Sequence, residues 1–82
     1  MKILLYNFEA AMEMPVGAKI LEIKRHENGM LVMVVLANPE YKMAKRNFVV
    51  LNVNSPVAPN YTYVGNFGDI YIFELPGKKE AK

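Results

Sequence analysis

A short basic segment carries the side chains of this 82-residue chain that are best suited to holding an anion. It contains Tyr41, Lys42, Lys45 and Arg46. If residues 40–46 form a helical turn, Lys42 shares a face with Lys45 or Arg46. Cations on one face could bind a phosphate group, and Tyr41 could stack on a base. The alternative is a solvated basic loop, because runs of charge usually face water.

Residues from other parts of the chain complete the predicted site. Arg25 and His26 precede the turn of a predicted hairpin, and Tyr61 opens a later strand. An arginine offers a planar fork for phosphate oxygens, and a tyrosine ring offers a stacking surface. We therefore predict that a small phosphorylated ligand would contact residues of one set: Arg25, His26, Tyr41, Lys45, Arg46 and Tyr61.

Catalytic chemistry has little support in this sequence. The only histidine is His26 and there is no cysteine, so a structural zinc site cannot form. Ser55 and Thr62 are the only residues of their types, and neither lies in a nucleophile elbow. The acidic residues are scattered, and the glycines stand at turns rather than in a phosphate-binding loop. We expect no enzymatic activity, no metal site and no cofactor.

Charge and hydropathy limit the classes of partner. The formal net charge of +2, from ten basic and eight acidic residues, is too weak for the basic stripe of a duplex-DNA-binding protein. No apolar run approaches the roughly 18 residues of a membrane span. The hydrophobic content of 52% is high for a small domain, so part of it is expected to cover a subunit interface. We predict a homo-oligomer, a dimer or larger, with neither membrane nor duplex DNA as partner.

The elements that must position these residues are predicted to be strands. The pair Asn28-Gly29 between apolar runs is a strong signal for a hairpin turn. Residues 9–14 fit either a helical turn or an extended piece, and residues 40–46 have the composition of a short helix. Strands are predicted over residues 2–8, 18–26, 30–37, 47–53, 61–67 and 70–75.

The predicted fold class is therefore all-β. We expect a single small domain over residues 1–76, with about six mostly antiparallel strands in a barrel-like or sandwich arrangement. It would contain at most one short helical turn. Residues 77–82 are predicted to form a disordered basic tail.

Residues 30–37 are apolar on both faces, as in a strand that is covered on both sides. A chain of this size builds only one thick core, so part of this strand is expected to face another subunit, most simply across a two-fold axis. The candidates are Met30, Val32, Val34 and Leu36, together with the aromatic hairpin described next.

An aromatic group occupies the last two predicted strands. Tyr61, Tyr63 and Phe67 are expected on one face, and Tyr71 and Phe73 on one face of the partner strand. Two interpretations remain open, namely cross-strand packing in the core and a pocket wall or oligomer surface.

Several segments resemble a family of small uncharacterised proteins from tailed bacteriophages and their prophages. The similar segments are Met-Pro-Val-Gly-Ala-Lys-Ile-Leu at residues 14–21, the Asn-Gly hairpin, Ala-Asn-Pro at 37–39, residues 48–56 and the closing hairpin over residues 63–74. Two departures exist. The family has Gly-Thr-Gly-His where this chain has Asn-Val-Asn-Ser at residues 52–55, and strand 30–37 lacks the family's frequent tryptophan.

The resemblance implies a phage origin, an all-β fold and no established activity. We expect a small phage accessory protein that acts in the host cytoplasm by binding. It would sequester a nucleotide-type signal of host defence or inhibit a host protein. The alternative is a structural or assembly module of the phage particle that binds no ligand.

Overall fold

The secondary structure consists of strands throughout the part of the chain that the structure describes. The computed structural model describes residues 1–77, which contain seven strands and no helix. The strands are β1 (Lys2–Asn7), β2 (Ala11–Pro15), β3 (Lys19–Arg25), β4 (Leu31–Ala37), β5 (Met43–Asn52), β6 (Thr62–Phe67) and β7 (Ile70–Glu74). The all-β prediction is confirmed, with one strand more than expected. Apart from Gly77, the predicted tail lies outside the described residues.

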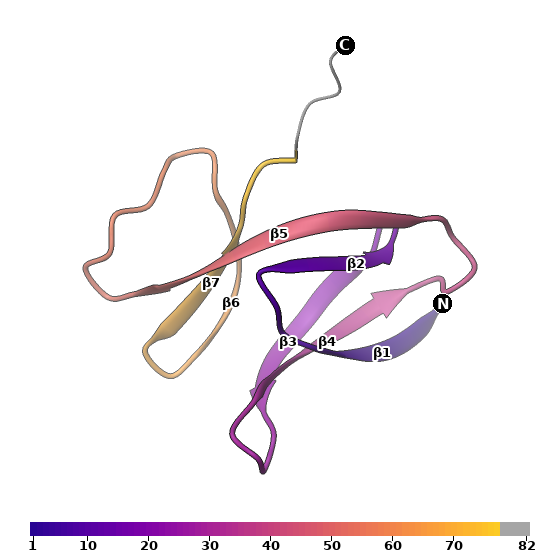
Figure 1. Ribbon diagram of the computed structural model, residues 1–82, viewed down its shortest axis with the longest axis horizontal. Helices are drawn as coiled ribbons and strands as arrows, with labels where there is room; N and C mark the ends of the chain where they lie inside the picture. Colours follow the sequence, from indigo (N-terminus) through magenta and orange to yellow (C-terminus); the bar gives the residue numbers. More distant parts are fainter. Residues whose placement is uncertain (78–82) are drawn as a thin grey trace.

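The strands form two antiparallel sheets (Figure 1). A three-stranded sheet has the order β1-β4-β3, and a four-stranded sheet has the order β2-β5-β7-β6. The two sheets meet where β3 lies against β6. At the other side β1 and β2 do not pair, so the sheets do not close into a barrel.

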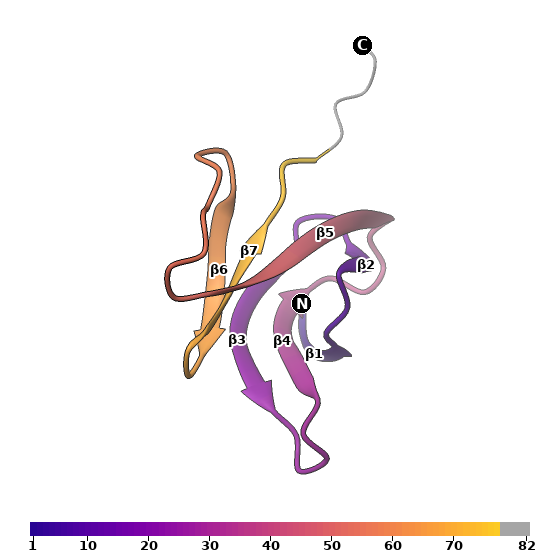
Figure 2. The same ribbon diagram turned by 60° about the vertical axis from the view of Figure 1, so that its left-hand side comes forward.

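The long strand β5 determines the shape of the four-stranded sheet. Its first half, Met43–Asn47, pairs with β2, and its second half, Phe48–Asn52, pairs with β7. Figure 2 shows β5 crossing from the β6–β7 hairpin to β2. This strand thereby connects the two ends of the molecule.

The core lies between the two sheets. Met14, Met33, Val35 and Ile72 are fully buried there, and Phe48 is nearly so. An unbranched methionine adapts to irregular gaps, which suits a core between two sheets that diverge. At the β3–β6 contact, a Cβ on Gly65 would lie only 3.0 Å from Cγ1 of Ile23. A side chain at position 65 would therefore require Ile23 to move by a few tenths of an ångström.

Residues 40–46 do not form the helical turn that their composition predicts. Strand β5 already begins at Met43, and Ala44 pairs with Met14 of β2. A helix of this length is unstable alone, so pairing with a neighbouring strand outweighs its propensity. Residues 9–14, for which two conformations remained open, supply most of β2.

Two β-bulges change which side chains share a face. The first, between Ile20 and Glu22, leaves Leu21 as an extra residue on β3. The second, between Tyr63 and Gly65, reverses the alternation along β6. Tyr63 then lies opposite Phe73 and Phe67 opposite Ile70, so these β6 rings point to opposite faces. The prediction that Tyr61, Tyr63 and Phe67 share one face is wrong for Phe67, because a bulge shifts the period by one residue.

The β3–β4 turn contains the predicted positive φ at glycine. Gly29 has a φ of 88°, whereas Asn28 has no positive φ. The N–H of Gly29 donates to the C=O of His26 (2.9 Å), and the N–H of His26 donates to the C=O of Met30 (2.8 Å). The loop therefore has three residues and ends in a left-handed glycine, which is a common alternative to the two-residue Asn-Gly turn.

We expect Gly29→Val to lower the free energy of unfolding by about 1 kcal/mol or more. A Cβ at this position meets no heavy atom within 4 Å, so the cost comes from the left-handed backbone alone. Urea denaturation measures the change. Glu27→Val in the same loop is the control, with an expected effect of about 0.5 kcal/mol or less. Equal stability of the two variants would contradict this account.

Candidate functional site

The most extensive polar contacts of the described residues surround Arg46. Its Nε and Nη2 donate to the two carboxylate oxygens of Glu74, each at 2.7 Å. Its Nη1 donates to the C=O of Ala18 at 2.7 Å, and its guanidinium lies 5.8 Å from the ring centre of Phe48. Arg46 thus connects β5, β7 and the segment that enters β3.

The charged form of the Arg46 guanidinium is stabilised by its surroundings. Its pKa is raised above the ordinary value, mainly because Glu74 accepts two hydrogen bonds from it, while partial burial acts in the opposite direction. A paired guanidinium that also binds a backbone carbonyl has few donors left for a phosphate. Arg46 therefore has a structural role here, and it lies in strand β5 rather than in a helical turn or a solvated basic loop.

The structure does not bring the basic segment together as one anion site. Tyr41 is exposed in a turn, where its N–H donates to the C=O of Asn38. Lys45 and Arg46 are neighbours in a strand, so their side chains point to opposite faces. Lys45 lies across from Glu13 on β2. Tyr61 packs against Phe73, with ring centres 6.5 Å apart.

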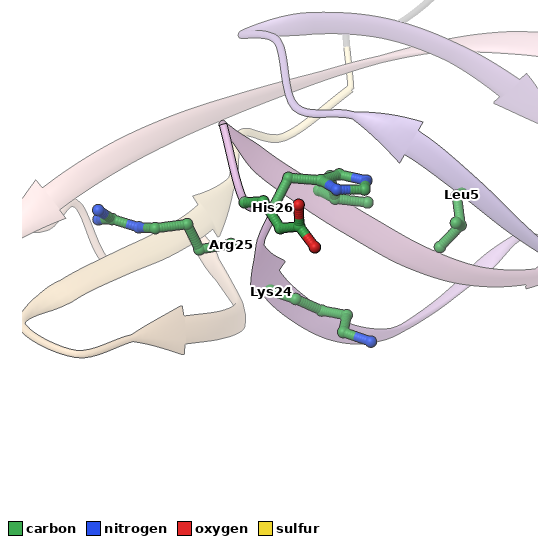
Figure 3. Close-up of a pocket in the computed structure, with 6 residues that line it drawn as sticks. Leu5, Lys24, Arg25 and His26 are labelled. Carbon is green, nitrogen blue, oxygen red and sulfur yellow. The ribbon is translucent and has the colours of Figure 1, made fainter. Parts of the chain in front are cut away.

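A small cavity of about 220 Å³ lies beside the β3–β4 hairpin, and we call it the hairpin pocket. It is lined by Leu5, Lys24, Arg25, His26, Glu27 and Val32. Two predicted site residues, Arg25 and His26, belong to it. The side chain of Arg25, however, points away toward β6 and β7, where its guanidinium lies 5.1 Å from the ring centre of Phe67 (Figure 3).

The size of the hairpin pocket limits what it can bind. Pockets that enclose small-molecule ligands usually measure about 300 Å³ or more. The hairpin pocket could accept a phosphate group or a single side chain, because its lining combines the apolar Leu5 and Val32 with Lys24 and His26. No cluster of three or more potential metal-binding side chains occurs within residues 1–77.

The outer face of the three-stranded sheet is unusually apolar. Ile3 and Leu5 of β1 are 66% and 63% exposed, and the bulged Leu21 of β3 is 46% exposed. Val34 and Leu36 of β4 lie between them in the sheet, half-buried. Because the exposed Leu21 does not belong to the core cluster between the sheets, we assign it to the same outer face. We call these residues the aliphatic face: Ile3, Leu5, Leu21, Val34 and Leu36. Contiguous exposed apolar surface of this kind usually marks a contact with another macromolecule.

The sequence patterns predict only two of the five residues of the aliphatic face. Val34 and Leu36 were expected at an interface, whereas Ile3 and Leu5 were not singled out. Their alternation along residues 2–7 was an available signal, because neighbouring strand residues face opposite ways. Leu21 could not be placed without knowledge of the bulge.

The aromatic group packs on the other sheet. The rings of Tyr63 and Phe73 meet edge to face with centres 5.6 Å apart, and the Tyr63 hydroxyl donates to Oδ1 of Asn66 at 2.8 Å. These contacts are cross-strand packing on the outer face of the four-stranded sheet, because Tyr63 and Phe73 lie opposite each other in the β6–β7 register. Packing of this kind supports the hairpin itself.

Comparison with known proteins returns no relatives. No family model matches the chain, and neither the curated proteins nor the solved structures contain a match. Within the described residues, no helix has the length and apolar character needed to span a membrane.

We expect Arg46→Ala to lower the free energy of unfolding by about 1.5–3 kcal/mol, because it leaves a half-buried carboxylate and a carbonyl without their charged donor. Both Arg46 and Glu74 are about one fifth exposed, which lets water replace part of the loss. Denaturant unfolding followed by circular dichroism measures the change. Lys45→Ala is the matched control and should cost about 0.5 kcal/mol or less. If Arg46→Ala is no worse than this control, the guanidinium does not hold the sheets together.

Proposed function

We propose that this protein is an accessory protein that acts by binding another protein, and that the aliphatic face is its contact surface. The observation that carries the proposal is the exposure of Ile3 and Leu5 on the sheet face that they share with Val34 and Leu36. Removing such side chains from water stabilises a complex by about 25 cal/mol per Å² of apolar surface that is buried. A binding partner would supply this stabilisation.

The border of the aliphatic face favours a partner of particular chemistry. Along β3 the residues opposite Leu36, Val34 and Val32 are Lys19, Glu22 and Lys24, respectively. This border carries one more cation than anion. We propose that the partner presents an apolar patch with acidic side chains beside it, since complementary charge gives orientation and speed of association.

The phage context of the proposal rests on the resemblance of residues 14–21 and the closing hairpin to small phage proteins. In that context the partner is a host protein that the accessory protein inhibits. The alternative partner is a protein of the phage particle, for which this chain would be an assembly module. Mass spectrometry of purified virions separates the two, because only the assembly module remains with the particle.

We propose as a second candidate that the hairpin pocket binds the phosphate end of a nucleotide-type signal. The observation that favours it is that Lys24 and His26 line a cavity together with the apolar Leu5 and Val32. At about 220 Å³ the cavity accepts the phosphate but not the base, so the base would lie outside.

The first candidate predicts that a charge placed on the aliphatic face weakens binding of the protein partner. We expect Leu21→Glu to reduce capture of the protein partner from infected-cell extract by about tenfold or more, since burying one leucine contributes about 1.5–3 kcal/mol. Val57→Glu is the matched control, because Val57 is exposed to almost the same extent, 45% against 46%, in the loop between β5 and β6. Both variants should remain as stable as the wild type. A partner captured equally by all three proteins contradicts the proposed surface.

For the second candidate, we expect mono-, di- or cyclic nucleotides to raise the melting temperature of the wild type. The rise should disappear in Lys24→Ala and shrink with added salt, because charge supplies much of the attraction. Lys45→Ala, on the far strand β5, should retain the full rise. No thermal shift with any nucleotide in the panel would exclude this candidate and leave the protein partner.

A further inference from the structure

The two sheets together have four edge strands, and three of these edges are protected against pairing with another chain. Strand β2 ends in Pro15, which has no N–H to donate. Strand β6 carries the bulge at Tyr63 and lies against β3. Strand β3 has its own bulge and bears Lys19, Glu22, Lys24 and Arg25. Bulges, prolines and charges are the usual means by which proteins block edge strands.

The fourth edge strand, β1, has none of these features. Its six residues, Lys-Ile-Leu-Leu-Tyr-Asn, pair with β4 in unbroken register and contain no proline, no glycine and no charge after Lys2. On its other side β1 has no neighbouring strand among residues 1–77. An exposed, regular and apolar edge strand of this kind is a template for another strand.

The hydrogen-bond pattern shows which groups this free edge offers. The N–H of Phe8 donates to the C=O of Leu31 at the end of the β1–β4 ladder. In an antiparallel pair such residues alternate, so the even-numbered residues of β1 use their backbone groups on β4. The N–H and C=O groups of Ile3 and Leu5 therefore point to the free edge.

We propose that β1 pairs antiparallel with β1 of a second copy of this chain, about a two-fold axis at Leu4. In this register Ile3 of each copy lies opposite Leu5 of the other, and the outward N–H and C=O groups of these residues satisfy one another. The short run Ile-Leu-Leu is apolar on both sides of Leu4, which makes the edge complementary to itself. An interface of this kind closes after two subunits.

The charges on the strand are compatible with this pairing. Lys2 would lie opposite Tyr6 of the second copy rather than opposite another lysine. The two Lys2 side chains would stand about 14 Å apart along the strands, since each residue rises about 3.4 Å. This separation exceeds the screening length of about 8 Å at physiological salt. Pairing shifted toward the N-terminus would bring the lysines together, so charge favours the register centred on Leu4.

Pairing through β1 would join the two three-stranded sheets into one continuous sheet. Ile3 and Leu5, which now lie at the rim of the aliphatic face, would then stand in its middle. The inference goes beyond the proposed function and does not depend on it. Its tests measure association of the chain with itself, whereas partner capture tests the face, so each can fail without the other.

The first test compares Leu5→Pro with Leu5→Val by sedimentation at several protein concentrations. Valine and proline shorten the side chain similarly, but only proline removes the N–H that the free edge presents. That N–H is not used in the ladder with β4, so proline is tolerated at this position. We expect Leu5→Val to remain dimeric, and the dissociation constant of Leu5→Pro to rise about tenfold or more relative to it. Equal association of the two variants, or a monomeric wild type at tens of micromolar, overturns the proposal.

The second test uses disulfide formation and does not require Leu5→Pro to fold. The chain has no cysteine, so a single introduced thiol can form only a bond between copies. Leu4 lies on the proposed axis, where its Cα stands about 4.5–5.5 Å from that of the second copy, within disulfide range. Ile3 stands beyond the roughly 7 Å limit from Ile3 of the second copy. We expect Leu4→Cys to form covalent dimers on mild oxidation and Ile3→Cys to form few. Crosslinking that is equal in both variants, or stronger in Ile3→Cys, overturns the register.

Discussion

The guanidinium of Arg46 is the contact on which the arrangement of the two sheets depends. It binds both carboxylate oxygens of Glu74 on β7 and the carbonyl of Ala18 just before β3. Three segments far apart in the sequence are thus held at one point, beside the buried Phe48. A bidentate arginine suits this role because its donors are fixed in a plane and each of its three nitrogens donates to an oxygen.

The small size of the domain explains why so much apolar surface remains outside the core. A chain of 82 residues can bury only about 60–65% of the surface that its unfolded form exposes. Here the two sheets meet along β3 and β6 but stay open between β1 and β2. The inner faces share one core, while the outer face of the three-stranded sheet and the edge of β1 stay uncovered. These uncovered parts are the natural places for contacts with other chains.

The proposed binding surface and the proposed dimer use different groups of the same strand. The side chains of Ile3 and Leu5 belong to the aliphatic face, whereas their backbone groups belong to the free edge. In a dimer the two faces would become one surface of twice the width. A partner would then bury a larger area without any change in the monomer, which is the usual benefit of a two-fold symmetric assembly.

Local patterns in the sequence determined the fold class, most of the strands and the glycine turn at the β3–β4 hairpin. Period-two alternation and turn residues act over a few positions, so they can be recognised from residue types alone. The same patterns indicated that Val34 and Leu36 lie on a face outside the core. The tertiary structure alone decided the roles of residues that depend on distant partners.

Arg46 became a structural residue because Glu74 lies beside it on β7, 28 positions later in the chain. Residues 43–46 entered a strand because β2 was there to pair with them, and Phe67 changed face because of a bulge. The candidate site lies at the hairpin pocket and the aliphatic face rather than at the basic segment, because contacts between distant residues separate the side chains of that segment. Long-range pairing energies exceed the weak local preferences that a sequence displays.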